Sequence, residues 1–109
     1  MNLITLAETQ AGLAARASSG RSAVTVHGGR EHALRQTVMA LNEGEHLHEH
    51  EHHGGETTVL VLQGRIRLVT GAETRGAAPG DFLVLPERRH RIEAETDAAF
   101  LFTNVVRHP

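Results

Sequence analysis

A dense run of histidines lies near the middle of this chain and is the part of the sequence best suited to chemistry. Five of the nine histidines fall within residues 46–53, at positions 46, 48, 50, 52 and 53. The chain contains no cysteine, so imidazole and carboxylate groups are the side chains that could hold a transition metal. The run is therefore either a metal site or a solvated polar loop.

The spacing of the histidines favours a metal site. His50 and His52 are two residues apart, so both rings leave the same face of an extended segment. His90 begins a segment, residues 90–96, in which it shares one face with apolar residues while charged residues take the other. An inward His90 would complete three nitrogen ligands, and Glu56 could add an oxygen. Such a set suits a divalent Zn, Mn, Fe, Ni or Cu ion and leaves coordination positions open.

The elements that would position these side chains are short strands. From residue 22 onward, segments with two-residue alternation are separated by Gly, Asp, Asn or Pro. Residues 33–41 could pass as a helix on propensity alone, but Thr37, Val38 and the neighbouring strands favour a strand. Many short strands with one small helix indicate an all-β sandwich or closed barrel. We expect strands at 23–27, 33–41, 57–63, 65–70, 82–85, 90–96 and 98–106, and a turn-rich link at 71–81.

The chain of 109 residues is long enough for one domain with one core. Residues 1–22 are expected to form a helical arm and residues 23–109 the barrel. Within the arm, residues 5–17 are rich in alanine, and Thr5 with Glu8 forms a capping-box pattern that predicts the start of the helix. The apolar residues expected to dock this helix on the barrel are Leu6, Leu13 and Ala17.

Composition and charge exclude several classes of partner. The 11 basic and 13 acidic residues are interspersed, and three Phe with no Tyr or Trp provide little surface for base stacking, so nucleic-acid binding is not expected. Apolar runs are far shorter than the roughly 18 residues of a membrane span. The N-terminus lacks the pattern of a signal peptide, so we expect a soluble cytoplasmic protein without membrane association.

These residues resemble the two motifs of the cupin superfamily. The first motif, G-x5-H-x-H-x(3,4)-E-x6-G, appears as Gly44, His50, His52, Glu56 and Gly64. The second, G-x5-P-x-G-x2-H-x3-N, appears in part as Gly80, Pro86 and His90. The resemblance covers residues 33–106 and implies a double-stranded β-helix, or jelly-roll barrel, that is commonly a dimer. It also implies a metal held by the two histidines and glutamate of the first motif and the histidine of the second.

The sequence departs from both motifs at informative positions. Seven residues separate Glu56 from Gly64, so Thr57 stands where the glutamate is usual. Alternation along the strand then aims Thr57 into the barrel and Glu56 outward, and Glu56 could bind only if a local bulge re-aimed it. In the second motif Arg88 replaces the glycine, the histidine comes one residue early, and Ala94 replaces the asparagine. A three-histidine site is therefore better supported than one that includes the carboxylate.

Other polar residues are open to two interpretations. His46 or His48 could replace either of the first-motif histidines if the loop register differs, whereas His53 is expected to be a solvated loop residue. Arg35 and Gln36 could line the mouth of the barrel or lie on a wet face.

Two functions follow from this set of residues. In the first, the protein binds a divalent metal and a small organic ligand in an aliphatic pocket, and the metal would act as a Lewis acid or, if iron, activate dioxygen. In the second, a metal-free, non-catalytic barrel binds a small molecule or stabilises an assembly. A homodimer that buries an edge strand or the N-terminal segment is expected in either case. The sequence leaves both functions open.

Overall fold

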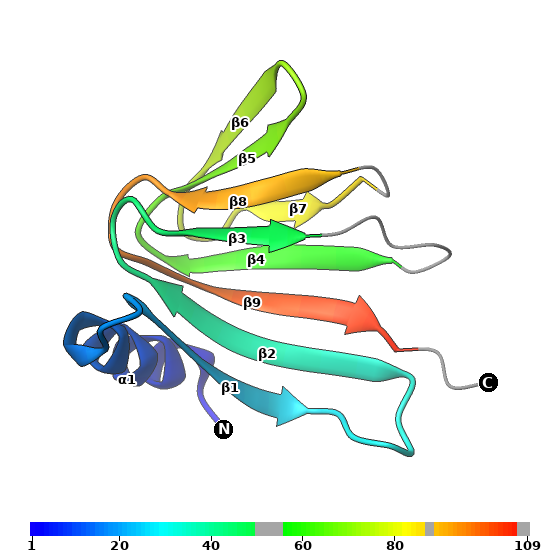
Figure 1. The fold of residues 1–109 in the computed structure, drawn as a ribbon. Helices are drawn as coiled ribbons and strands as arrows, with labels where there is room; N and C mark the ends of the chain where they lie inside the picture. The colour runs from blue at the N-terminus through cyan, green and yellow to red at the C-terminus, as the bar shows by residue number, and fades with distance from the viewer. Residues whose placement is uncertain (50–55, 87–88, 107–109) are drawn as a thin grey trace.

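The computed structural model describes residues 1–49, 56–86 and 89–106, which form two packed antiparallel sheets and a helix (Figure 1). The strand order is β1-β2-β9-β4-β7 in one sheet and β3-β8-β5-β6 in the other. This architecture confirms the predicted all-β fold. The elements, in chain order, are α1 (Leu3–Arg16), β1 (Arg21–His27), β2 (Leu34–Leu41), β3 (His46–Glu49), β4 (Thr57–Gln63), β5 (Ile66–Thr70), β6 (Glu73–Ala77), β7 (Phe82–Val84), β8 (His90–Ala94) and β9 (Ala98–Val105).

The core lies between the two sheets and is filled by alternate residues of their strands. β9 is the central strand of the larger sheet, since it pairs with β2 along one edge and with β4 along the other. Phe100 of β9 lies opposite Met39 and Val61, so these three side chains share the inner face. The largest fully buried side chains of this core come from both sheets and are Phe100, Ile66, Ile92, Val59 and Val61, while Val38 is buried on the opposite face of β2.

The helix α1 begins earlier than the sequence pattern predicted. Its N-cap is Asn2, whose side-chain oxygen accepts a hydrogen bond from the backbone N–H of Thr5 at 3.0 Å. Thr5 therefore lies inside the helix, and the predicted capping box with Glu8 is wrong. Asn is among the best N-cap residues, so Asn2 satisfies the first free backbone donors three residues upstream of the expected cap.

The face by which α1 packs on the sheet also differs from the prediction. The buried residues of the helix are Ala7, Gln10 and Ala14, whereas Leu13 is 44% exposed. Ala7 and Ala14 cluster with Ala40 and Ala99 on the outer face of the larger sheet. Small side chains on both surfaces let the helix approach the sheet closely, and Leu62 of β4 packs against the same cluster. In the described part of the chain, no helix is long and apolar enough to cross a membrane.

Two strands lie where the sequence predicted none. β6 occupies residues 73–77 within the expected turn-rich link, and β3 occupies residues 46–49 within the histidine run. The sequence of β6, ETRGA, has no apolar alternation because β6 is an edge strand with four of its five residues exposed. The ambiguous segment that became β2 is a strand, as predicted.

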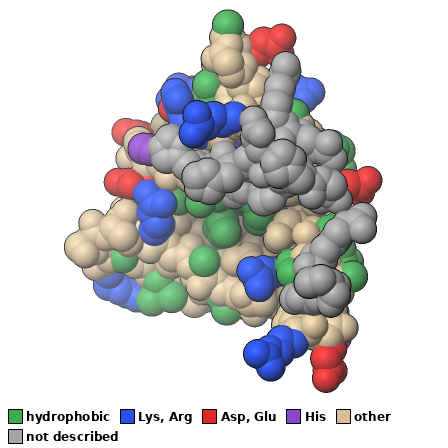
Figure 2. All heavy atoms as spheres, turned by 45° about the vertical axis from the view of Figure 1, so that its right-hand side comes forward, with side chains coloured by type: hydrophobic (Ala, Val, Ile, Leu, Met, Phe, Trp, Pro, Cys, Tyr) green, Lys and Arg blue, Asp and Glu red, His purple; other side chains and the backbone are tan. Residues whose placement is uncertain are grey.

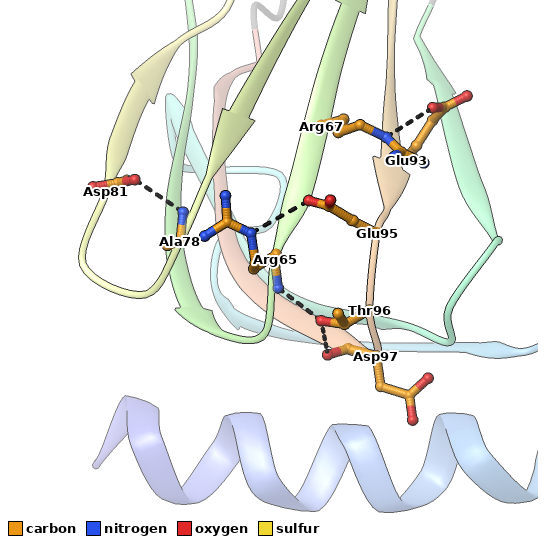
Figure 3. A network of polar contacts seen from close by, with 8 residues as sticks. All are labelled: Arg65, Arg67, Ala78, Asp81, Glu93, Glu95, Thr96 and Asp97. Atoms are coloured by element: carbon orange, nitrogen blue, oxygen red, sulfur yellow. Dashed lines mark hydrogen bonds and ion pairs between the residues drawn. The ribbon is translucent and has the colours of Figure 1, made fainter.

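One end of the sandwich is fixed by close contacts around the turn between β4 and β5. Gly64 has a φ of 71°, and a Cβ placed there would collide with the backbone carbonyl of Asp97, so this position requires glycine. The Thr96 hydroxyl accepts a hydrogen bond from the Arg65 backbone N–H at 3.0 Å and donates one to the Asp97 carbonyl at 3.2 Å (Figure 3). The Asp97 carboxylate accepts a third from the backbone N–H of Glu43 at 2.7 Å.

Candidate metal and ligand site

The opposite end of the sandwich carries the candidate site, and His90 is its best-defined residue. His90 is the first residue of β8, is 4% exposed, and shares the inner face with Ile92 and Ala94, which are 0% and 1% exposed. The segment is buried on one side because its neighbours in the sheet supply apolar residues there: Ile92 lies opposite Leu68 of β5 and Leu47 of β3. An imidazole is thus held at the edge of the core.

Thr57 and Glu56 lie at the start of β4 at this same end (Figure 1). Thr57 is 4% exposed and continues the inner face of Val59 and Val61, whereas Glu56 is exposed. The backbone carbonyl of Thr57 accepts a hydrogen bond from the Leu85 N–H at 2.9 Å, which ties the start of β4 to β7. The inward side chain at this position is therefore a neutral hydroxyl, as the alternation predicted, and not a carboxylate.

The other predicted ligands are only partly within the described structure. His50, His52 and His53 lie outside the described residues, as does Arg88. His46 is half-buried in β3 and lies opposite Glu93 of β8. Among residues 1–49, 56–86 and 89–106, no three His, Asp or Glu side chains gather closely enough to hold a metal by themselves. The described residues therefore contribute His90 to the predicted set.

The outer face of the smaller sheet carries a network of charges. The Glu93 carboxylate accepts a hydrogen bond from Arg91 Nε at 2.7 Å and lies 3.5 Å from Arg67 Nε. The hydrogen bond from Arg91, with the positive charges of both arginines, holds the pKa of Glu93 below its usual range. Arg65 pairs with Glu95 at 3.3 Å on the same face, as Figure 3 shows. The outer face of β5 is thus polar, while Ile66 and Leu68 take its inner face.

A cleft of about 500 Å³ opens on the inner face of the larger sheet near the hairpin that joins β1 to β2. Its lining is mixed, with one arginine, several hydroxyl and amide side chains and two large apolar side chains. Figure 2 turns this end of the molecule forward and shows apolar side chains gathered in the middle, with basic and acidic side chains around them. The residues that line the cleft are Thr25, Gly28, Gly29, Arg35, Thr37, Met39, Phe102 and Asn104.

The lining of the cleft includes Arg35, a residue that the sequence could not assign to either face of its strand. Arg35 could have lined the mouth of the barrel or faced solvent, and in the structure it does both, since it lines the cleft and is exposed. Alternation within 33–41 could have assigned Arg35 to the face of Thr37 and Met39, but the sequence alone does not say which face of that strand is inward. A second cleft, of about 600 Å³, lies between the β5–β6 hairpin and β7 and includes Glu73 and Arg75 in its lining.

The two facing antiparallel sheets define the protein as a small jelly-roll barrel. The sequence model of the cupin domain family matches residues 37–106, more than half of the 109-residue chain, and the chain therefore belongs to this family. The resemblance inferred from the motifs is confirmed. A search of the curated proteins gave no match.

Solved structures with the same fold come from several bacteria. A cupin superfamily protein from Desulfitobacterium hafniense aligns with a TM-score of 0.69 and 18% identity, covering 80% of this chain and 78% of that one. An RmlC-like cupin from Desulfovibrio desulfuricans aligns with a TM-score of 0.67 and 25% identity, covering 78% and 81%. A cupin-superfamily sugar phosphate isomerase from Silicibacter pomeroyi aligns with a TM-score of 0.70 and 22% identity, covering 80% and 60%. The likeness to the first and third supports the fold alone.

Proposed function

We propose that this cupin binds one divalent transition metal through His50, His52 and His90, with a small organic ligand at the open coordination positions. The observation that carries the proposal is the burial of His90 on the inner face. Its cross-strand partner is Glu49, and His50 is the next residue in the chain. Because Cα atoms of opposed residues in antiparallel strands lie about 4.5–5.5 Å apart, Glu49, in the middle of the histidine run, lies beside the buried imidazole.

The proposal places one requirement on the chain after β3. Leu47 packs against the core, so a strand that alternated regularly from Leu47 would give the even-numbered positions to the outer face. His50 and His52 can join His90 only if the alternation shifts by one residue after Glu49, as it does at a β-bulge. His46 or His48 could replace them as ligands only if the alternation shifted by one residue earlier in β3.

A site of this composition would carry a net positive charge. Three neutral imidazoles leave the charge of a divalent ion uncompensated, since Thr57 stands where a carboxylate would reduce it and Glu56 is exposed at the edge of β4. Glu56 would join the ligands only if the start of β4 were re-aimed. When bound, the metal would supply Lewis-acid chemistry or, if iron, dioxygen activation. His90 would hold the ion, and the apolar inner face would exclude water around the ligand.

Elemental analysis of protein purified without a histidine tag tests this proposal. We expect about one equivalent of a transition metal per chain, and its loss in a His90→Ala variant and in a His50→Ala, His52→Ala double variant. A matched control is the His27→Ala, His32→Ala double variant, which removes two exposed imidazoles that are not among the proposed ligands and whose ring centres lie 4.7 Å apart. Less than about 0.1 equivalent in the unaltered protein, with no uptake on titration, contradicts the proposal.

A second candidate function is a metal-free barrel that binds a small molecule or supports an assembly. The observation that favours it is the loss of family residues at Thr57 and Ala94, both of which are buried on the inner face. Buried positions that no longer carry metal-binding or supporting polar groups are expected in a barrel that has given up its metal. The same metal analysis separates the two functions.

We also propose that the protein is a homodimer. β7 is an edge strand, and its Phe82 and Val84 are 61% and 63% exposed. Phe82 lies opposite Leu60 of β4, and Val84 lies opposite Thr58. Both side chains are therefore on the outer face of the larger sheet, at its edge. Exposed apolar side chains on an open strand edge favour pairing with a second copy.

A further inference from the structure

Arg35 belongs to a row of polar side chains that crosses the inner face of the larger sheet. Arg35 of β2 lies opposite Asn104 of β9, and Asn104 lies opposite Thr57 of β4. Directly opposed residues of antiparallel strands point to the same face, so the three side chains share it. Strands are spaced about 4.7–4.9 Å apart, so Arg35 and Thr57 are two spacings, or roughly 10 Å, apart at the backbone.

The cleft around Arg35 is cationic. Among its lining residues there is no carboxylate, and within the described part of the chain Arg35 forms no ion pair. In contrast, Arg21, Arg65, Arg67 and Arg91 each lie within 3.5 Å of a glutamate oxygen. Arg35 lines the cleft, is exposed and has no carboxylate partner among the described residues, so its guanidinium is available to bind an anion.

The backbone of the β1–β2 connection comes close to Arg35 at Gly28. Gly28 has a φ of 147°, and a Cβ placed there would lie 3.3 Å from the Cα of Arg35 and 3.4 Å from its Cγ. Both the backbone conformation and the space therefore favour glycine at position 28. The stem of Arg35 thus lies close to the β1–β2 connection, with room there for glycine but not for a larger residue.

Hydrogen-bond donors surround the same volume. Thr37 is 7% exposed and adjoins Thr25, its partner in β1, and both line the cleft with Asn104. Hydroxyl and amide groups donate to oxyanions, and Met39 and Phe102 supply the apolar wall that a small organic ligand requires. The volume of about 500 Å³ is within the range of small-molecule sites.

We infer that this cleft binds the oxyanion group of a small organic acid or phosphate ester, with Arg35 as its principal partner and Asn104 and Thr37 as further donors. The inference rests on the proposed small-molecule function and names the class of ligand. Two nearly parallel hydrogen bonds from the guanidinium fork would match a carboxylate or phosphate group. The remainder of the ligand would extend along the polar row towards Thr57 and the proposed metal.

The inference is tested by NMR titration of the protein as purified and after chelator treatment, with succinate and with inorganic phosphate as probes. We expect saturable shifts of the Arg35 side-chain Nε–H and of backbone amides that line the cleft, in both preparations. The carboxylate and phosphate arms identify which group the cleft prefers. Because the chelated protein is titrated separately, failure of the metal proposal and failure of this one give different results.

Variants make the assignment specific. Arg35→Met should weaken binding about ten- to hundredfold, as expected for loss of a charged hydrogen-bond partner. The affinity of Arg35→Lys should lie between those of the unaltered protein and Arg35→Met, because lysine keeps the positive charge but lacks the paired N–H donors of the guanidinium. The control Arg75→Met removes an arginine from the second cleft and should leave binding unchanged. Equal binding by Arg35→Met and the unaltered protein, or no saturation with either probe, overturns the inference.

Discussion

His90 lies directly opposite Glu49 across the β3–β8 pair, which brings the buried imidazole next to the point where the chain enters His50. The arrangement joins two motifs about forty residues apart in the sequence. It also predicts how metal binding depends on individual histidines. His90→Ala should lower metal affinity more than about a hundredfold, because even groups that only support a ligand contribute 10- to 100-fold. Isothermal titration with Zn²⁺ measures this, with the His27→Ala, His32→Ala variant as the control.

Metal affinity should also depend on pH with a defined sign. Imidazole binds metal in its neutral form, and its reference pKa is about 6.5. Protonation competes with the metal as the pH falls, so affinity should drop below about pH 6. Equilibrium dialysis at pH 5 and pH 7.5 measures the change. Equal metal retention at both values would show that imidazoles are not the main ligands.

Thr57 and Glu56 provide a test of the missing carboxylate. Thr57→Glu should increase metal affinity, because Thr57 is the inward residue at this end of β4. The metal-free variant should lose at least about 1–3 kcal/mol of unfolding free energy, since a buried carboxylate is left without a partner. Glu56→Gln is the matched control and should change neither quantity. Loss of metal from Glu56→Gln would instead identify Glu56 as a ligand. Metal titration and urea unfolding provide the two readouts.

The Glu93 network predicts a stability change that depends on pH. Its pKa is lowered by the hydrogen bond from Arg91 and by the charges of Arg91 and Arg67. A lowered folded-state pKa stabilises the fold above the unfolded value of about 4.3, and this contribution is lost as pH falls through the folded value. Glu93→Gln should therefore destabilise at pH 7 by less than about 1 kcal/mol, because the pair is partly exposed.

The difference between Glu93→Gln and the unaltered protein should shrink below about pH 4 and in high salt. Urea unfolding across this range measures it. Glu73→Gln removes an exposed carboxylate from β6 and should show no such pH dependence. A constant difference at all pH values would attribute the effect to packing instead of charge.

Alanine should lower the free energy of unfolding at position 64 and raise it at position 12. Gly64→Ala forces a left-handed backbone on a side chain and a collision with the Asp97 carbonyl, so it should cost at least about 1–3 kcal/mol. Gly12→Ala lies within α1, where a Cβ meets no atom within 4 Å, and should stabilise by roughly 0.5–1 kcal/mol. Thermal unfolding of both variants measures the contrast, and a stable Gly64→Ala variant would contradict the close approach.

The exposed residues of β7 predict an assembly. Phe82→Glu should shift the protein towards monomer in sedimentation velocity if the β7 edge forms the dimer. Ile4→Glu, at the 55% exposed start of α1, tests the N-terminal segment as the interface instead. Monomer alone at tens of micromolar in the unaltered protein would contradict the dimer.

The accuracy of the sequence-based prediction depended on how much of each strand is buried. β8 alternates clearly because its inner face packs in the core while its outer face carries the arginine and glutamate network, and β8 was placed correctly. β6 has no buried face to impose a pattern, and it was missed. The start of α1 was wrong because both Asn2 and Thr5 can cap a helix, and Asn is the more favourable N-cap residue of the two.

The candidate site was predictable to a similar extent. Strand alternation is sufficient to aim His90 and Thr57 inward, because each belongs to a strand with a continuous apolar face. Arg35 could not be assigned in this way, since its strand is covered on one face by α1 and on the other by the core, and both faces carry apolar residues. Its place follows from the pairing of β2 with β9, which is a long-range contact.

The tight fit of Gly64 against Asp97 divides the barrel into two regions with different freedom to change. At that end a methyl group added at position 64 would meet the backbone of Asp97, so the turn between β4 and β5 requires glycine at this position. At the other end, the chain leaves β3 and enters β4 and β8 beside His90 and Thr57. Substitutions of His90 or Thr57 can therefore alter the candidate site while they leave the contact between Gly64 and Asp97 intact.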